Sequence, residues 1–91
     1  MTNQSIINNL KALSGGNGFE VISNTAAHTK TSGFYSKIVV ITAATLTTLT
    51  PRATAPITGT ATGIAYPVGF ELAGEFTTIT LASGSVIAYN G

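Results

Sequence analysis

The sequence predicts an all-β protein: a small antiparallel sandwich or jelly-roll-like barrel, preceded by an N-terminal arm or short helix. Short stretches rich in β-branched and aromatic residues follow one another from residue 19 onward. Turn signals separate them about every 8 to 12 residues, a spacing typical of sandwiches and small barrels. The 91 residues make one domain, which we divide into an arm with a glycine-rich hinge, residues 1–18, and a β domain, residues 19–91.

The first thirteen residues carry a different pattern from the rest. Ile6, Ile7, Leu10 and Leu13 are spaced as on one face of a short helix. So short a helix is not stable alone in water, so it must pack on its own domain, a sister subunit or another partner. The glycine-rich residues 14–18 then break the pattern and act as a hinge or turn. We expect Ile6, Ile7 and Leu10 to anchor this arm to a partner.

The β domain begins with a strand that ends in a polar turn at Ser23 and Asn24. The strongest strand is predicted at residues 34–42, whose apolar residues occupy both faces and therefore indicate cover on both sides. We read Gly74 and the Ser83–Gly84 pair as separators of the last short strands. The expected strands are residues 19–21, 34–42, 45–50, 57–62 as an edge strand, 70–72, 76–80 and 86–89. The expected core residues are Phe34, Ile38, Val40, Phe70, Phe76, Ile79 and Val86.

Charge is unusually scarce in this chain. Only 8% of the residues are charged, against about 25% in ordinary soluble domains, and the mean hydropathy is +0.39. The longest strongly apolar run, residues 38–41, is far shorter than the roughly 20 residues of a bilayer helix, so we expect no membrane partner. A net charge of +1 gives no electrostatic case for nucleic acid. We infer that much of the surface lies against other protein, and we expect a homo-oligomer.

Few residues could carry chemistry. The single histidine, His28, lies in a polar stretch with no carboxylate nearby in sequence, so we expect a solvated or locally hydrogen-bonded loop residue. Glu20, Glu71 and Glu75 are expected on solvated strand positions. With no aspartate and no cysteine, the chain has few ways to build a site with shifted pKa values. We therefore assign no catalytic residue, no metal ligand and no cofactor, and expect that the protein is not an enzyme.

The three tyrosines allow two interpretations. Aromatic side chains anchor many interfaces, so Tyr35, Tyr66 and Tyr89 could form a binding face. They could equally be half-buried strand residues with a hydroxyl group in water, which we favour. We keep all three as candidate partner-binding residues beside those of the arm.

The stretch YPVGFELAGEFTTITLASGSVIAYNG, residues 66–91, resembles the C-terminal part of small β-rich virion surface proteins of tailed bacteriophages. Their pattern is a Pro-x-Gly turn, a Phe-Thr-x-Ile segment and a final Ser-Gly-x-Val-Ile-Ala-Tyr. The stretch FYSKIVVITAATLTTLT, residues 34–50, resembles them too, so the resemblance covers about half of the chain. The matching residues are Pro67, Gly69, Gly74, Phe76, Thr77, Ile79, Ser83, Gly84, Val86, Ile87, Ala88 and Tyr89.

The resemblance implies a virion structural protein, made in the host cytoplasm and placed on the capsid surface. Such proteins are often trimers, so we expect a homotrimeric capsid decoration (cement) protein that bridges major capsid protein subunits. Its last strand is expected to be paired with a neighbouring subunit or exchanged between subunits. One alternative is a head or tail fibre or spike module that recognises a receptor, with Tyr35 and Tyr66 as candidates. A remote alternative is a small hydrolase that depends on Glu71 or His28.

Overall fold

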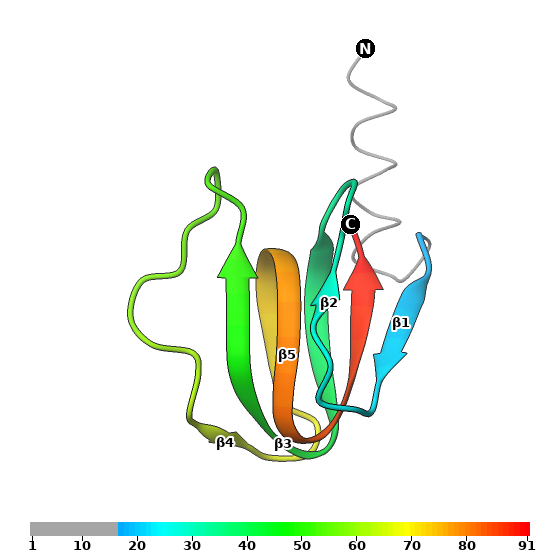
Figure 1. Cartoon of the computed structure of the whole chain (residues 1–91), viewed down its shortest axis with the longest axis vertical. Helices are drawn as coiled ribbons and strands as arrows, with labels where there is room; N and C mark the ends of the chain where they lie inside the picture. The colour runs from blue at the N-terminus through cyan, green and yellow to red at the C-terminus, as the bar shows by residue number, and fades with distance from the viewer. Residues whose placement is uncertain (1–16) are drawn as a thin grey trace.

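The computed structural model describes residues 17–91 of the chain. The predicted arm, with Ile6, Ile7 and Leu10, lies outside the described residues, as does most of the hinge. The described part contains strands and loops and no helix, which confirms the predicted all-β class. Its five strands are β1 (Phe19–Ile22), β2 (His28–Thr29), β3 (Tyr35–Pro51), β4 (Ala65–Tyr66) and β5 (Glu71–Asn90) (Figure 1).

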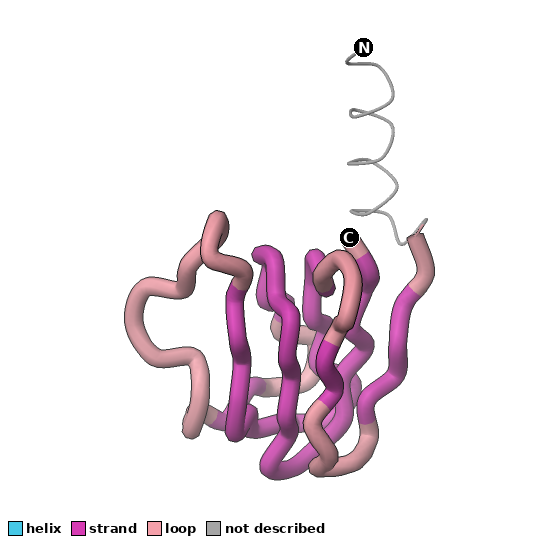
Figure 2. The backbone as a smooth tube through the Cα atoms, turned by 45° about the horizontal axis from the view of Figure 1, so that its top comes forward, coloured by secondary structure: helices cyan, strands magenta, loops and turns pink. Residues whose placement is uncertain are grey.

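Two long, bent strands, β3 and β5, build most of the sheet. Along β3, rising residue numbers lie opposite falling residue numbers on β5, from Lys37 opposite Tyr89 to Thr50 opposite Thr78. The two strands therefore run antiparallel. Residues 35–39 of β3 also pair on their other side with the start of β5, where Val39 lies opposite Glu71. Each long strand therefore contributes to two layers, and the sheet folds over onto itself (Figure 2).

The short strands complete the two layers. β1 pairs antiparallel with the end of β5, where Phe19 lies opposite Tyr89, and β2 pairs with the middle of β5 at Ile79 and Thr78. β4 pairs with β3 near its bend, where Ala65 lies opposite Thr45. One layer thus holds β1, the end of β5, the first half of β3 and the start of β5, and the other holds the rest (Figure 1). This is the small antiparallel β fold that the sequence predicts.

Several expected boundaries were wrong. Residues 34–42 and 45–50 belong to one strand, and the three short strands expected after residue 70 are one strand of 20 residues. Gly74 and Gly84, read as separators, instead lie inside β5, where a glycine often marks a bulge or a tight bend. Residues 57–62, expected as an edge strand, form a loop that lies between Pro56 and Gly63.

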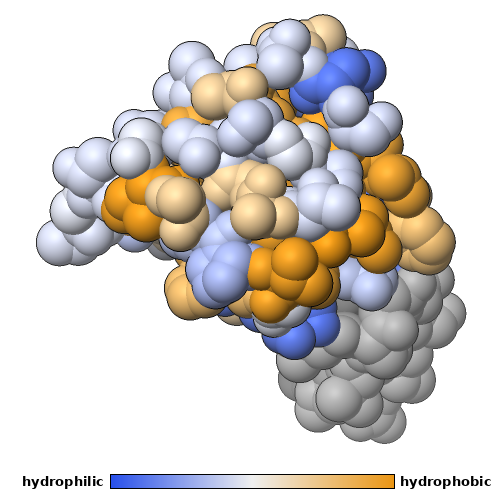
Figure 3. Space-filling model, turned by 90° about the horizontal axis from the view of Figure 1, so that it is seen from below, coloured by the Kyte–Doolittle hydropathy of each residue, from blue (hydrophilic) through white to orange (hydrophobic). Residues whose placement is uncertain are grey.

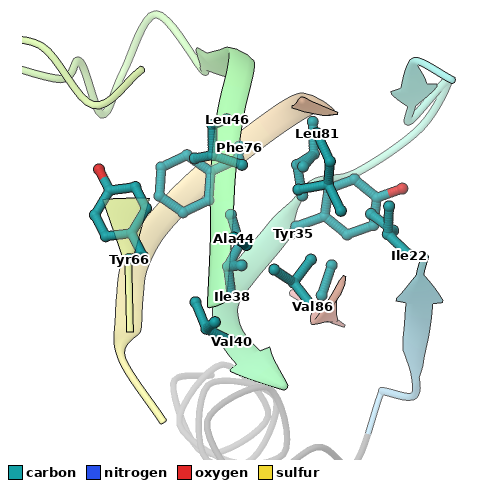
Figure 4. Packing of buried hydrophobic residues seen from close by; sticks show 12 residues of the cluster. Ile22, Tyr35, Ile38, Val40, Ala44, Leu46, Tyr66, Phe76, Leu81 and Val86 are labelled. Carbon is teal, nitrogen blue, oxygen red and sulfur yellow. The ribbon is translucent and has the colours of Figure 1, made fainter. Parts of the chain in front are cut away.

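The core fills the space between the two layers. Five of the seven expected core residues are buried, namely Ile38, Val40, Phe76, Ile79 and Val86 (Figure 4). Phe70 is 41% exposed and Phe34 is half-buried, so these two expectations were wrong. The remaining buried apolar residues are Ile22, Tyr35, Ala44, Leu46, Tyr66, Leu81 and Ala88.

The last strand is held within its own chain on both sides. The Asn90 N–H donates to the Gly18 carbonyl at 2.9 Å, and the Gly91 N–H donates to the Phe34 carbonyl at 2.8 Å. The Asn90 side chain accepts from Lys30 Nζ at 2.8 Å and donates to the Asn17 carbonyl at 3.2 Å. The pairing that we expected from a neighbouring subunit is therefore supplied by β1 and β3 of the same chain.

Candidate interaction surface

The three tyrosines do not form a common face. Tyr35 is 1% exposed, and its hydroxyl donates to Glu20 Oε1 at 3.0 Å. Tyr66 is also buried, and its hydroxyl donates to the Ala61 carbonyl at 2.6 Å. Because an internal acceptor satisfies each hydroxyl, both rings belong to the core, so neither is the half-buried residue with a hydroxyl group in water that we favoured.

Tyr89 alone reaches the outside of the sheet, where it is half-buried. Its ring lies 5.7 Å from that of Phe19, and Lys37 Nζ lies 5.1 Å from its centre. Lys37 Nζ is also 3.7 Å from Glu71 Oε1. The outer surface of this layer therefore combines aromatic rings with one neutralised ion pair.

The main candidate surface is an end of the molecule at which four large apolar residues are exposed. Val68 is 68% exposed, and the other three, Ile41, Ile64 and Phe70, are 40 to 44% exposed. We call these four residues the apolar end. Figure 3 views the molecule from this side and shows apolar surface gathered in several groups among weakly polar residues.

Backbone hydrogen bonds bring the apolar end together. The Gly69 N–H donates to the Val40 carbonyl at 2.8 Å, and the Val40 N–H donates to the Phe70 carbonyl at 3.0 Å, which places the turn at 67–70 beside β3. The Phe70 ring packs on Tyr66 at 5.1 Å, and the Tyr66 hydroxyl is itself anchored. The exposed side chains thus stand on a backbone whose position is fixed by the core.

A polar cluster joins β1, β2 and the turn between them. His28 Nδ1 lies 2.5 Å from Glu20 Oε2, and His28 Nε2 lies 2.9 Å from Asn24 Oδ1. The Ala26 N–H donates to the same Asn24 oxygen, which fixes the orientation of that amide. Both ring nitrogens therefore face oxygen acceptors, one on β1 and one in the turn that follows it.

This cluster corrects two expectations from the sequence. His28 is hydrogen-bonded, as one of our two alternatives had it, but it lies in β2 and not in a solvated loop, beside a carboxylate eight residues earlier in the chain. Glu20 does not point freely into water, since it accepts from both His28 and Tyr35. Burial of the Tyr35 ring, together with the hydrogen bond to Glu20 and the charge of that group, raises the pKa of the Tyr35 hydroxyl from 10.0 to about 12.

The other two glutamates are separated and paired. Glu71 faces Lys37, whereas Glu75 lies 3.3 Å from Arg52 Nη1, and the Arg52 guanidinium stands 4.8 Å from the centre of the Phe34 ring. Over residues 17–91, no three histidine or acidic side chains are grouped so that they could hold a metal ion. Nor is any helix of this part long and apolar enough to cross a membrane.

A shallow hollow of about 340 Å³ lies between the loop after β3 and the start of β5. Its walls include Leu49, Ile57, Leu72 and Phe76, all of which are apolar and belong to the core or pack against it. No charged side chain lines the hollow. It offers contact area for an apolar group but no polar residue for fixing a ligand's orientation.

Comparison with known proteins adds no assignment. The chain matches no protein-family model, and no curated protein or solved structure shows significant similarity to it.

Proposed function

We propose that this protein is a virion structural protein, and specifically a capsid decoration protein that binds major capsid protein subunits through its apolar end. The observation that carries the proposal is the joint exposure of Ile41, Ile64, Val68 and Phe70 on a fixed backbone. Summed over the four residues, the exposed area is roughly 300 Å², distributed over several groups (Figure 3), an amount comparable to the largest apolar patch of a typical monomer.

The arrangement of charge supports recognition by shape and apolar contact. Each of the three glutamates is paired within the chain, with His28, Lys37 or Arg52. Few free charges therefore remain to steer a partner or to select it by charge complementarity. Binding through the apolar end should consequently change little with ionic strength, unlike binding between oppositely charged surfaces.

The resemblance of residues 34–50 and 66–91 to phage virion proteins supports a place on the capsid surface. In that setting the protein would be made in the host cytoplasm, would self-associate as a homo-oligomer, for which the resemblance implies a trimer, and would bridge neighbouring capsid subunits. Many repeated copies around a shell convert a modest interface into firm attachment, because each further contact becomes intramolecular. The proposal involves no catalytic step, no cofactor, no nucleic acid and no membrane.

The binding test uses particles that lack the protein and a pair of variants at the most exposed residue of the apolar end. Val68→Lys adds a charge at the centre of the contact, whereas Val68→Thr keeps the β-branched shape. We expect the lysine variant to lose binding to capsids in co-sedimentation while it unfolds at the same urea concentration as the wild type. The threonine variant should retain most of its binding. Equal binding by both variants would reject the apolar end as the contact.

Copy number separates decoration from the alternative of a fibre or spike. A decoration protein repeats over the whole shell, so quantitative mass spectrometry of purified particles should give on the order of hundreds of copies. A few tens of copies or fewer would instead indicate a fibre or spike. Absence from purified particles would reject a virion role altogether.

A further inference from the structure

The outer edge of β1 is open within the described part of the chain. β1 is the last strand of its layer and pairs with β5 alone (Figure 1). The hydrogen bond from the Asn90 N–H to the Gly18 carbonyl shows which residues of β1 form backbone hydrogen bonds with β5. Bonding alternates along an antiparallel pair, so Glu20 and Ile22 bond to β5, whereas the N–H and C=O groups of Phe19 and Val21 point to the open edge.

Among residues 17–91, nothing gives this edge the usual protection against pairing. Proteins shield open edges with lysine, proline, bulges or covering segments. β1 has the sequence FEVI and contains neither lysine nor proline. Phe19 is 56% exposed and Val21 is 54% exposed, so the side chains beside the free backbone groups are apolar as well.

The geometry points to antiparallel pairing of two copies of this chain through β1, about a two-fold axis at Glu20. This inference rests on the proposed function in one respect, namely that the protein works as an assembly of its own copies; it replaces the trimer that the resemblance implies with a two-fold pair. With the axis at Glu20, Phe19 of one copy lies opposite Val21 of the partner subunit, and the reverse holds on the other side. Both positions bear outward N–H and C=O groups, so the register forms four backbone hydrogen bonds.

The side chains fit this register on both faces. On the outer face, Phe19 already packs beside Tyr89 and Val21 lies opposite Ile87, so pairing would extend an apolar strip from one copy to the next. On the inner face, the two Glu20 residues would lie opposite each other. Each of these carboxylates already accepts from its own His28 and Tyr35, which reduces the repulsion between the two.

The size of the contact makes the pairing weak in dilute solution. A four-residue edge supplies about half of the roughly 800 Å² per partner found in a standard interface. We therefore expect a dissociation constant on the order of 10 μM to 1 mM for the isolated protein. The copies would be held firmly only where a shell brings them together.

A cysteine scan tests the register. Because the chain has no native cysteine, any disulfide must form at the introduced position. In the variant Glu20→Cys the two Cα atoms would lie about 4.5 Å apart, within the range for a disulfide. In Phe19→Cys or Val21→Cys the equivalent atoms would be about 8 to 9 Å apart, too far for a disulfide to form without movement.

We expect oxidation to give a covalent dimer with Glu20→Cys at least ten times faster than with the other two variants or with Thr58→Cys, a control in an exposed loop. Similar rates at all four positions would overturn the register.

A second pair of variants tests the pairing without a disulfide. Val21→Pro removes an edge N–H group that β5 does not use, whereas Val21→Thr keeps that group and the β-branched shape. The wild type and the threonine variant should show concentration-dependent dimers in sedimentation velocity up to about 1 mM, and the proline variant should stay monomeric with an unchanged fold by circular dichroism.

A monomeric wild type over that range would overturn the inference. That result would leave the capsid-binding and copy-number tests of the proposed function unaffected, so the two failures are distinguishable.

Discussion

Gly84 is the residue on which the bend of β5 depends, and Gly84→Ala should be severely destabilising. Gly84 has a φ of +83°, a conformation that costs an alanine about 1–2 kcal/mol. A Cβ atom there would also meet the Ala43 carbonyl oxygen at 2.3 Å and the Ala44 Cα at 2.6 Å. Because both are backbone atoms that cannot rotate away, the clash adds about 1–3 kcal/mol. The total, about 2–5 kcal/mol, is a large share of the roughly 5–14 kcal/mol expected for 91 residues.

Urea denaturation measures this loss, and Gly59→Ala is its matched control. Gly59 has a φ of +93°, and no atom lies within 4 Å of the position of an added Cβ atom. Alanine at this position therefore has the conformational cost without the clash. Both substitutions also restrict the unfolded chain equally, and that contribution cancels in the comparison. With a denaturant slope of about 1.5 kcal/mol per M, a loss of 3 kcal/mol lowers the midpoint by about 2 M. Equal midpoints for the two variants would refute the argument that close backbone contact requires glycine at this bend.

Four further predictions follow from contacts in the core and the polar cluster. Ile79→Ala, at a fully buried position, should cost about 2–5 kcal/mol in urea denaturation, whereas Arg52→Ala should cost less than about 1 kcal/mol, because its ion pair is partly exposed. His28→Ala should cost about 1 kcal/mol by the same measurement, since Glu20 then keeps only its Tyr35 partner. The folded pKa of Tyr35 is about 12, above its usual 10, so its contribution to stability is complete below pH 10 and is lost as the pH rises to 12. That alkaline loss should disappear in Tyr35→Phe, and an identical pH profile in the variant would contradict the assignment.

The sequence predicted the strand-rich fold and five of the twelve buried core residues, because both depend on local pattern. The β-branched run at residues 38–41 predicts a strand, and Ile38 and Val40 do face the core, whereas Ile41 is 40% exposed instead of covered. The same pattern could not reveal that neighbouring strands continue through a bend. Gly74 and Gly84 have the composition of turns, but hydrogen bonding on both sides of each keeps the strand continuous, and only the tertiary pairing supplies those bonds.

The candidate sites were harder to predict because they depend on contacts between distant residues. Tyr35 and Tyr66 were expected to be half-buried with a hydroxyl group in water, or else part of a binding face, but internal acceptors at Glu20 and Ala61 let both rings enter the core. Composition alone gives no sign of such acceptors. Phe70 was assigned to the core, yet the turn that begins at Pro67 leaves it at the rim. An aromatic residue next to a turn is therefore weak evidence of burial.

The bend of β5 also explains why Glu20 and His28 meet, although each pairs with a different part of that strand. Glu20 lies opposite Ala88 in one layer, whereas His28 lies opposite Ile79 in the other. Nine residues of extended chain span about 30 Å, so a straight β5 would hold the two side chains far apart. β5 folds back at Gly84, where the backbone of Ala43 and Ala44 leaves room only for glycine. The same bend brings β1 over β2, and the Glu20 carboxylate then faces His28 instead of the open edge. A fold with so few charges can therefore leave that edge apolar, since its one acidic residue, Glu20, is already hydrogen-bonded to His28 and Tyr35.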